Sequence, residues 1–272
     1  MLVKSYAKIN LHLKVLGIND NNYHLLQMVN TKINFYDVLK FKKNKNNSIN
    51  IFMKDLPQEE NLVYKVAKYM FDKYNISGGI DIYIKKNIML GAGLAGGSAN
   101  AASTISTIDK MYKLNLSVLE KREIAACFGT DIIYCLENSS ALVGGIGEKI
   151  ESFNLKRKYS VLLINPNIHV STKDVYNLYD DNNTYSIEET NKELEDKTIS
   201  DLLYNDLEKV VFNIYPEIKN IKEELLVYSN NVLMSGSGST LYVVDSKKIL
   251  KKILKEFRNK YPNYKYVLTK TR

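Results

Sequence analysis

Hydrophobic and polar residues alternate along the first part of the chain, over residues 5–16. Apolar side chains stand at every second position from Ala7 to Val15, and Lys8 and Asn10 are among the polar residues between them. A period of two predicts a strand with one buried face and one basic polar face. Residues 23–34 and 35–41 resume the extended pattern after an Asn-rich turn, so several strands are expected first.

Helical spacing follows, and strands return after it. The pattern predicts a strand over 80–84 and helices over 61–74, 98–112 and 118–127, the last opened by the capping box Ser117–Glu120. Beyond residue 150 it predicts a helix starting near Ser171, further helices over 206–213, 217–228 and 246–261, and strands over 159–164, 231–234, 240–244 and 264–268. Residues 180–196 are polar and weakly patterned, so we expect a loop there. This order predicts an α+β protein with one domain over 1–150 and a second over 151–272.

Glycine is concentrated between the strand at 80–84 and the next helix, in Gly91-Ala92-Gly93-Leu94-Ala95-Gly96-Gly97-Ser98. A glycine-rich turn that opens a helix suits phosphate, because free N–H groups and the positive end of the helix dipole face the same anion. The spacing is also close to a P-loop and to a dinucleotide fingerprint. However, glycine stands where a P-loop needs lysine, and a capping box follows where the fingerprint needs a second strand. A plain glycine-rich turn remains the alternative.

The composition indicates the class of protein but does not identify its ligand. The chain has 272 residues, 45% of them hydrophobic, which is enough for a sizeable core. No apolar run approaches the ~20 residues of a membrane span, and two cysteines without a C-x-x-C spacing indicate neither a disulfide framework nor a zinc site. We therefore expect a cytoplasmic protein without a membrane partner. The net charge of +8 fits an anionic partner, either nucleic acid or a phosphorylated small molecule, and the lysine-rich residues 40–45 are expected to form a solvated turn.

Several motifs, taken in their order, resemble the GHMP kinase superfamily of small-molecule kinases. They are Ala7-Lys8-Ile9-Asn10-Leu11, Tyr23-His24, the glycine loop through Ala102, Gly129-Thr130-Asp131, Gly145-Ile146-Gly147-Glu148 and the turn Ser235-Gly236-Ser237-Gly238. The resemblance implies phosphoryl transfer from ATP, with Mg²⁺, to the hydroxyl of a small alcohol. It is greatest for the branch that acts on a cytidine diphosphate ester of methylerythritol in isoprenoid precursor synthesis. It also implies an N-terminal lobe like domain 2 of ribosomal protein S5 and a C-terminal ferredoxin-like α/β sandwich.

The resemblance assigns the chemical step to Asp131 and Lys8. Asp131 would be the base that accepts the hydroxyl proton, and Lys8 would lie beside it and keep its carboxylate ionised. Asn10 would bond the diol of the substrate. The residues alone also allow Asp131 to be a turn former, and Lys8 and Asn10 to be solvated residues on a strand face.

The resemblance assigns the other site residues to the two ligands. ATP would be bound by Leu90, Gly91, Gly93, Leu94, Ala95, Gly96, Gly97, Ser98 and Asn61. A plain helix N-cap explains Asn61 equally well. The cytidine part would be bound by Tyr23, His24, Thr172 and Tyr176, since a pyrimidine needs aromatic faces and edge hydrogen bonds, although a tyrosine in a chain with 20 of them usually serves packing. No carboxylate stands out as a magnesium ligand, so we expect much of the Mg²⁺ shell to be phosphate and water.

The chain departs from the family pattern in three places. Ala95 replaces a usual glycine, which we expect to be tolerated only if its φ is negative. Met89 replaces a usual proline, and residues 132–134 replace Val-Pro-Phe, but no reactive group is lost. The alternatives are another GHMP kinase, of mevalonate or homoserine type, and a basic RNA-binding protein. The Tyr23-His24 pair and Asp131 argue against the homoserine type.

Overall fold

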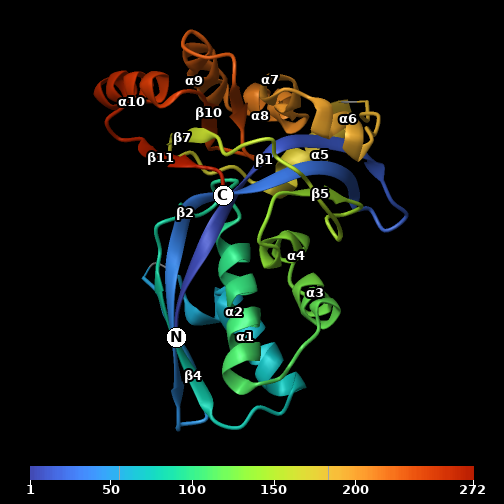
Figure 1. The fold of residues 1–272 in the computed structure, drawn as a ribbon, viewed down its shortest axis with the longest axis vertical. Helices are drawn as coiled ribbons and strands as arrows, with labels where there is room; N and C mark the ends of the chain where they lie inside the picture. Colours follow the sequence, from blue (N-terminus) through green and yellow to red (C-terminus); the bar gives the residue numbers. More distant parts are fainter. Residues whose placement is uncertain (55, 183) are drawn as a thin grey trace. The chain divides into compact units, whose positions relative to one another are not determined.

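The computed structural model describes residues 1–54, 56–182 and 184–272, which form two compact units (Figure 1). Unit 1 consists of residues 1–7, 35–90 and 95–138, and unit 2 of residues 8–34, 91–94 and 139–272. The first two strands and the glycine loop therefore contribute residues to both units. A single domain boundary near residue 150 stays a prediction.

The strands of unit 1 pair around β2. The expected strands over 23–34 and 35–41 are one continuous strand, because no turn interrupts the pairing near residue 35. β2 pairs antiparallel with β4, so that Phe41 faces Ile82, and β3 pairs parallel with the other edge of β4. Lys40, Lys42 and Lys43 lie within this ladder, so the expected turn at 40–45 is wrong, whereas the expected exposure of these lysines is confirmed. The bounds are β1 Leu2–Ile18, β2 His24–Asn44, β3 Ile49–Phe52 and β4 Gly79–Lys85.

Helices build the rest of unit 1, and α2 packs against both α1 and α4 (Figure 1). Asn61 caps α1 by accepting a hydrogen bond from the backbone N–H of Val63 at 3.0 Å, and the capping box of Ser117 and Glu120 opens α3 as expected. Helix α2 starts at Gly96 rather than at Ser98, so two more glycine-loop residues belong to its first turn. Helix α4 was not expected. The bounds are η1 Gln58–Glu60, α1 Leu62–Lys73, α2 Gly96–Tyr112, α3 Val118–Ala126 and α4 Thr130–Leu136.

In unit 2, the remaining parts of β1 and β2 pair with further strands. β2 pairs antiparallel with β5, with Val29 opposite Leu142, and β5 pairs antiparallel with β6. β1 pairs parallel with the short strand β8 at His12 and Leu13. The bounds are β5 Ala141–Gly144, β6 Lys149–Ser152 and β8 Tyr204–Asn205.

A second sheet in unit 2 has the strand order β11-β7-β10-β9, with every neighbouring pair antiparallel. This order, with helices in the connections, is that of a ferredoxin-like sandwich, as the resemblance implied. Helices α9 and α10 contact the sheet, and the apolar run Val161–Ile164 of β7 is fully buried in it. The bounds are β7 Ser160–Asn165, α8 Leu207–Ile214, α9 Pro216–Leu226, β9 Val232–Met234, β10 Leu241–Val244, α10 Lys247–Lys260 and β11 Lys265–Lys270.

The expectation that residues 180–196 form a loop is wrong in part. Helix α6 has the capping box of Thr190 and Glu193, and its Leu194 is fully buried. Ser186 N–H donates to the carbonyl of Val15 at 2.8 Å, which fastens the segment to β1. Residue 183 lies outside the described residues. The bounds are α5 Thr172–Asn182, α6 Asn191–Asp196 and α7 Ile199–Leu202.

Candidate functional site

A chain of three polar side chains runs along the buried part of β1 and β2 in unit 2. Lys8 Nζ donates to Asn10 Oδ1 at 2.8 Å, and Asn10 Nδ2 donates to Asn30 Oδ1 at 2.6 Å. Lys8 is 5% exposed, and Asn10 and Asn30 are fully buried. These residues are therefore not solvated groups on a strand face, which excludes that alternative for Lys8 and Asn10. Asn30, which the sequence did not single out, holds the amide orientation in which Asn10 presents its oxygen to Lys8.

The turn Ser235–Gly238 meets the glycine loop and β1 within unit 2. Ser235 Oγ donates to the carbonyl of Gly93 at 2.9 Å, and the backbone N–H of Lys8 donates to the carbonyl of Leu94 at 3.1 Å. Tyr242, just beyond the turn, donates its hydroxyl to the carbonyl of Asn10 at 2.7 Å. Three motifs from distant parts of the sequence thus meet through hydrogen bonds.

Gly93 is the point of closest approach in this cluster. Its φ is +71°, and a Cβ at this position would clash with the carbonyl oxygen of Ser235. Only glycine fits such a conformation and such a gap. Gly91, also at positive φ, lies against His169, which no sequence motif indicated.

His24 forms a second cluster with helix α5. Its ring lies 4.4 Å from the Tyr176 ring, centroid to centroid, with 33° between the planes. Its Nε2 is 2.9 Å from both carboxylate oxygens of Asp180. At the start of the same helix, the Thr172 and Ser237 hydroxyls are 2.8 Å apart. Tyr23 is 59% exposed, and its backbone N–H donates to Asn19 Oδ1. The structure thus brings His24 together with Tyr176 and adds Asp180, which the sequence analysis missed.

The glycine loop enters unit 1 at Ala95, the N-cap of α2. Ala95 has φ 52° and ψ 34°, so the expectation that its φ would be negative is wrong. An alanine here carries a cost of about 1–2 kcal/mol from its Cβ, which the surrounding structure must overcome. In the first turn of α2, Gly97 is exposed, Ser98 is half-buried, and a Cβ on Gly96 would be 2.8 Å from Lys86 Nζ. The Lys86 ammonium therefore lies beside this helix start, where its charge is balanced by the Asp37 carboxylate.

Two other residues of unit 1 have defined places. Asp131 lies in the first turn of α4 and is half-buried. Asn61 is 4% exposed and caps α1, so the structural explanation of this residue is confirmed, and its contact with adenine stays a prediction. Leu90, at the start of the loop, is 56% exposed.

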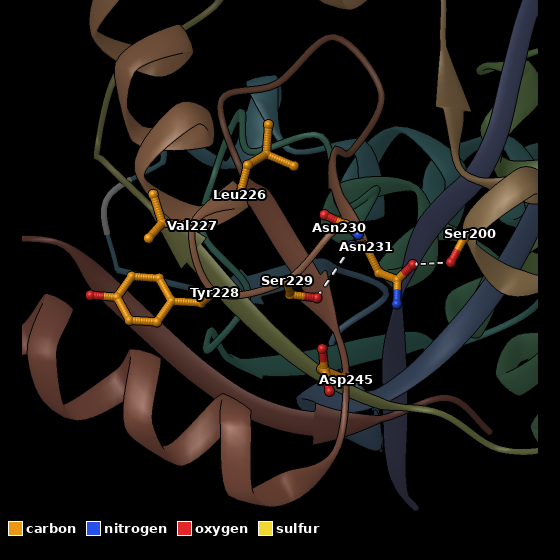
Figure 2. A pocket seen from close by; sticks show the side chains of 8 residues that line it. All are labelled: Ser200, Leu226, Val227, Tyr228, Ser229, Asn230, Asn231 and Asp245. Atoms are coloured by element: carbon orange, nitrogen blue, oxygen red, sulfur yellow. Dashed lines mark hydrogen bonds between the residues drawn. The ribbon is translucent and has the colours of Figure 1, made fainter.

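The described residues contain no group of three or more His, Cys, Asp or Glu side chains that could hold a metal ion. None of the helices in the described part of the chain is long and apolar enough to cross a membrane. A surface hollow of about 350 Å³ lies in unit 2 between α7, the end of α9 and Asp245 (Figure 2). None of the residues assigned above lines it.

Comparisons with known proteins extend this picture. The chain matches the family models described as GHMP kinases N terminal domain, over residues 61–138, and GHMP kinases C terminal, over residues 188–263. It is 38% identical to a 4-diphosphocytidyl-2-C-methyl-D-erythritol kinase of Thermoanaerobacter sp. (strain X514), over 97% of this chain and 93% of the relative. It is 37% identical to a protein of the same name from Clostridioides difficile (strain 630), over 92% and 91%.

Solved structures agree on the fold. A crystal structure of a 4-(cytidine 5'-diphospho)-2C-methyl-D-erythritol kinase covers the whole of both chains with a TM-score of 0.85 at 23% identity. A mevalonate kinase structure covers 100% of this chain and 99% of its own with a TM-score of 0.73 at 14% identity. At these identities the likeness concerns the fold alone.

Proposed function

The chain belongs to the GHMP kinases and, within them, to the 4-diphosphocytidyl-2-C-methyl-D-erythritol kinase family, and we propose that it transfers a phosphoryl group from ATP to the 2-hydroxyl of 4-diphosphocytidyl-2-C-methyl-D-erythritol. The product would feed isoprenoid precursor synthesis by the non-mevalonate route. The observation that carries the proposal is the identity of 38% over nearly the full length of a relative with that name. The cluster of Lys8, Asn10, Gly93 and the Ser235–Gly238 turn supports it from the structure.

In the proposed reaction, the substrate hydroxyl oxygen attacks the γ-phosphorus of ATP. Its proton passes to the Asp131 carboxylate, the bond from the γ-phosphorus to the bridging oxygen breaks, and ADP leaves. The fixed positive charge of Lys8 stabilises the negative charge on the phosphoryl oxygens in the transition state. Asn10 and Asn30 hold Lys8 in place, because its ammonium donates to the oriented Asn10 oxygen.

The phosphates of ATP and the cytidine of the second substrate are assigned to different residues. We assign the ATP phosphates to the loop from Leu90 to Ser98, where the start of α2 supplies N–H groups and a positive dipole end. We assign cytidine to His24 and Tyr176. Tyr23 and Thr172, which belong to the same two sequence motifs, are assigned to cytidine as well. The described residues offer no acidic cluster for a protein-built metal site. We propose that Mg²⁺ would be held largely by the phosphates of ATP and by water, and that it would offset part of their negative charge. A cytoplasmic location stays an expectation.

A substrate panel tests the function. The purified protein is supplied with ATP and Mg²⁺ and, in parallel, with the cytidine diphosphate ester of methylerythritol, mevalonate and homoserine. We expect efficient turnover of the cytidine ester alone, followed as ADP release and as phosphorus NMR of the product. Comparable kcat/KM with mevalonate or homoserine would refute the assignment. Tight, steeply salt-dependent binding of RNA without any turnover would favour the RNA-binding alternative.

A further inference from the structure

Asp180 is the partner of His24 that no sequence motif indicated. Both of its carboxylate oxygens lie 2.9 Å from His24 Nε2, and the two side chains are partly buried, with 26% and 16% exposed. Tyr176 stands four residues before Asp180 on α5, and residues at this spacing share one face of a helix. One helix face thus contacts the His24 ring with an aromatic surface and its Nε2 with a carboxylate.

The carboxylate decides which nitrogen of a neutral His24 carries the proton. An ionised carboxylate only accepts hydrogen bonds, so Nε2 must be the N–H donor and Nδ1 is left as an acceptor. His12 shows the opposite case in the same unit. Its Nδ1 is 3.1 Å from the carbonyl oxygen of Leu202, which also only accepts, so Nδ1 of His12 carries the proton. The two histidines are therefore opposite tautomers.

Tyr185 interacts with the same carboxylate. Burial raises the pKa of Tyr185, and the Asp180 charge and a hydrogen bond to Asp180 raise it further. Its hydroxyl therefore stays neutral and remains able to donate to Asp180. A carboxylate held by two donors has less freedom to turn away from His24.

We propose that Asp180 is a positioning residue for base selection: it keeps His24 Nδ1 as a hydrogen-bond acceptor, and this acceptor favours cytosine over uracil. Cytosine carries an amino group at ring position 4 that can donate to such an acceptor, whereas uracil carries a carbonyl oxygen there, which cannot donate. The proposal rests on the proposed function for the cytidine ligand, and it adds the residue that sets the specificity of that subsite.

The tautomer is tested first, without any ligand. Histidine labelled with ¹⁵N is observed by NMR at pH 8.5, where an imidazole of ordinary pKa is neutral. Only three histidines contribute signals, and single substitutions of His24 and His169 assign them. We expect the Nε2–H form for His24 and the Nδ1–H form for His12. In Asp180→Asn, whose amide can donate as well as accept, the Nε2–H preference of His24 should be lost.

A matched control lies on the same helix. Asp174 is exposed in the first turn of α5, and Asp174→Asn makes the same chemical change earlier on the same helix. The His24 tautomer should stay unchanged in that variant. An Nδ1–H form of His24 in the natural protein, or an unchanged tautomer in Asp180→Asn, would overturn the proposal.

Base selection is tested with CDP and UDP as probes in calorimetric titrations. We expect the natural protein and Asp174→Asn to bind CDP more tightly than UDP, and Asp180→Asn to lose about 10-fold of that preference, the factor for one ordinary hydrogen bond. The KM for ATP should not change. Equal binding of CDP and UDP by the natural protein would refute base selection. A clear CDP preference in a protein that does not phosphorylate the cytidine ester would instead refute the proposed function and leave the role of Asp180 standing.

Discussion

Replacing Gly93 with alanine tests whether the contact between the glycine loop and the Ser235–Gly238 turn holds unit 2 together. Gly93 combines a φ of +71° with backbone atoms on the side where a Cβ would stand. The nearest is the carbonyl oxygen of Ser235, and the carbonyl oxygen of Gly238 would be 3.0 Å away. Because these atoms belong to the backbone of a turn, they cannot turn away as a flexible side chain would.

The expected loss of stability has three terms. A left-handed backbone costs an alanine about 1–2 kcal/mol relative to glycine. Forcing an extra carbon into a packed site costs about 1–3 kcal/mol. The lower entropy of alanine in the unfolded chain returns about 0.4–1 kcal/mol. Gly93→Ala should therefore lower the free energy of unfolding by about 1–5 kcal/mol, a large share of the total for an ordinary domain.

Gly97→Ala is the matched control within the same loop. Gly97 lies in the first turn of α2, and nothing stands within 4 Å of a Cβ there, so alanine should be neutral or slightly stabilising. Urea unfolding, followed by both near- and far-UV circular dichroism, measures the two variants against the natural protein. Equal stability of Gly93→Ala and the natural protein would refute the argument from close approach.

The remaining predictions concern strain, catalysis and acidity. Ala95→Gly should raise the free energy of unfolding by up to about 1 kcal/mol, because glycine adopts the φ of 52° without strain; a loss of stability in the same urea assay would contradict this. Asp131→Asn should lower kcat by about 10²–10⁴ with both KM values nearly retained, and adding Lys8→Met should cost much less than the product of the two single effects; steady-state kinetics with a kcat of Asp131→Asn near the natural value would exclude the base role. Burial lowers the pKa of His12 from 6.5 to about 4, so the unfolded chain binds a proton that the folded protein does not. The free energy of unfolding is therefore unaffected by His12 above pH 6.5, and the titration of His12 lowers it by up to roughly 3 kcal/mol as the pH falls to 4. His12→Phe should flatten the dependence of urea unfolding on pH in this window, and an unchanged slope would assign the acid sensitivity to other groups.

Local features of the sequence were sufficient for most helices and strands. The alternation in β1 predicted the strand, and the capping box of Ser117 and Glu120 forms as expected. The polar face expected for β1 is wrong, because Lys8, Asn10 and His12 are buried together with the apolar residues between them. The motifs around Lys8, the glycine loop and Asp131 identified the family, since they are short and contiguous. The roles of these residues in the reaction stay predictions.

Tertiary structure decided what depends on contacts between distant segments. The Asp180 carboxylate meets His24 across 156 residues, and Asn30 meets Asn10 across 20, so no local pattern marks either partner. The φ of Ala95 is positive although alanine disfavours this region, so its local preference did not predict its conformation. Intrinsic propensity and periodicity are properties of a few neighbouring residues, whereas the orientation of a site side chain is set by packing and hydrogen bonds that exist only after the chain has folded.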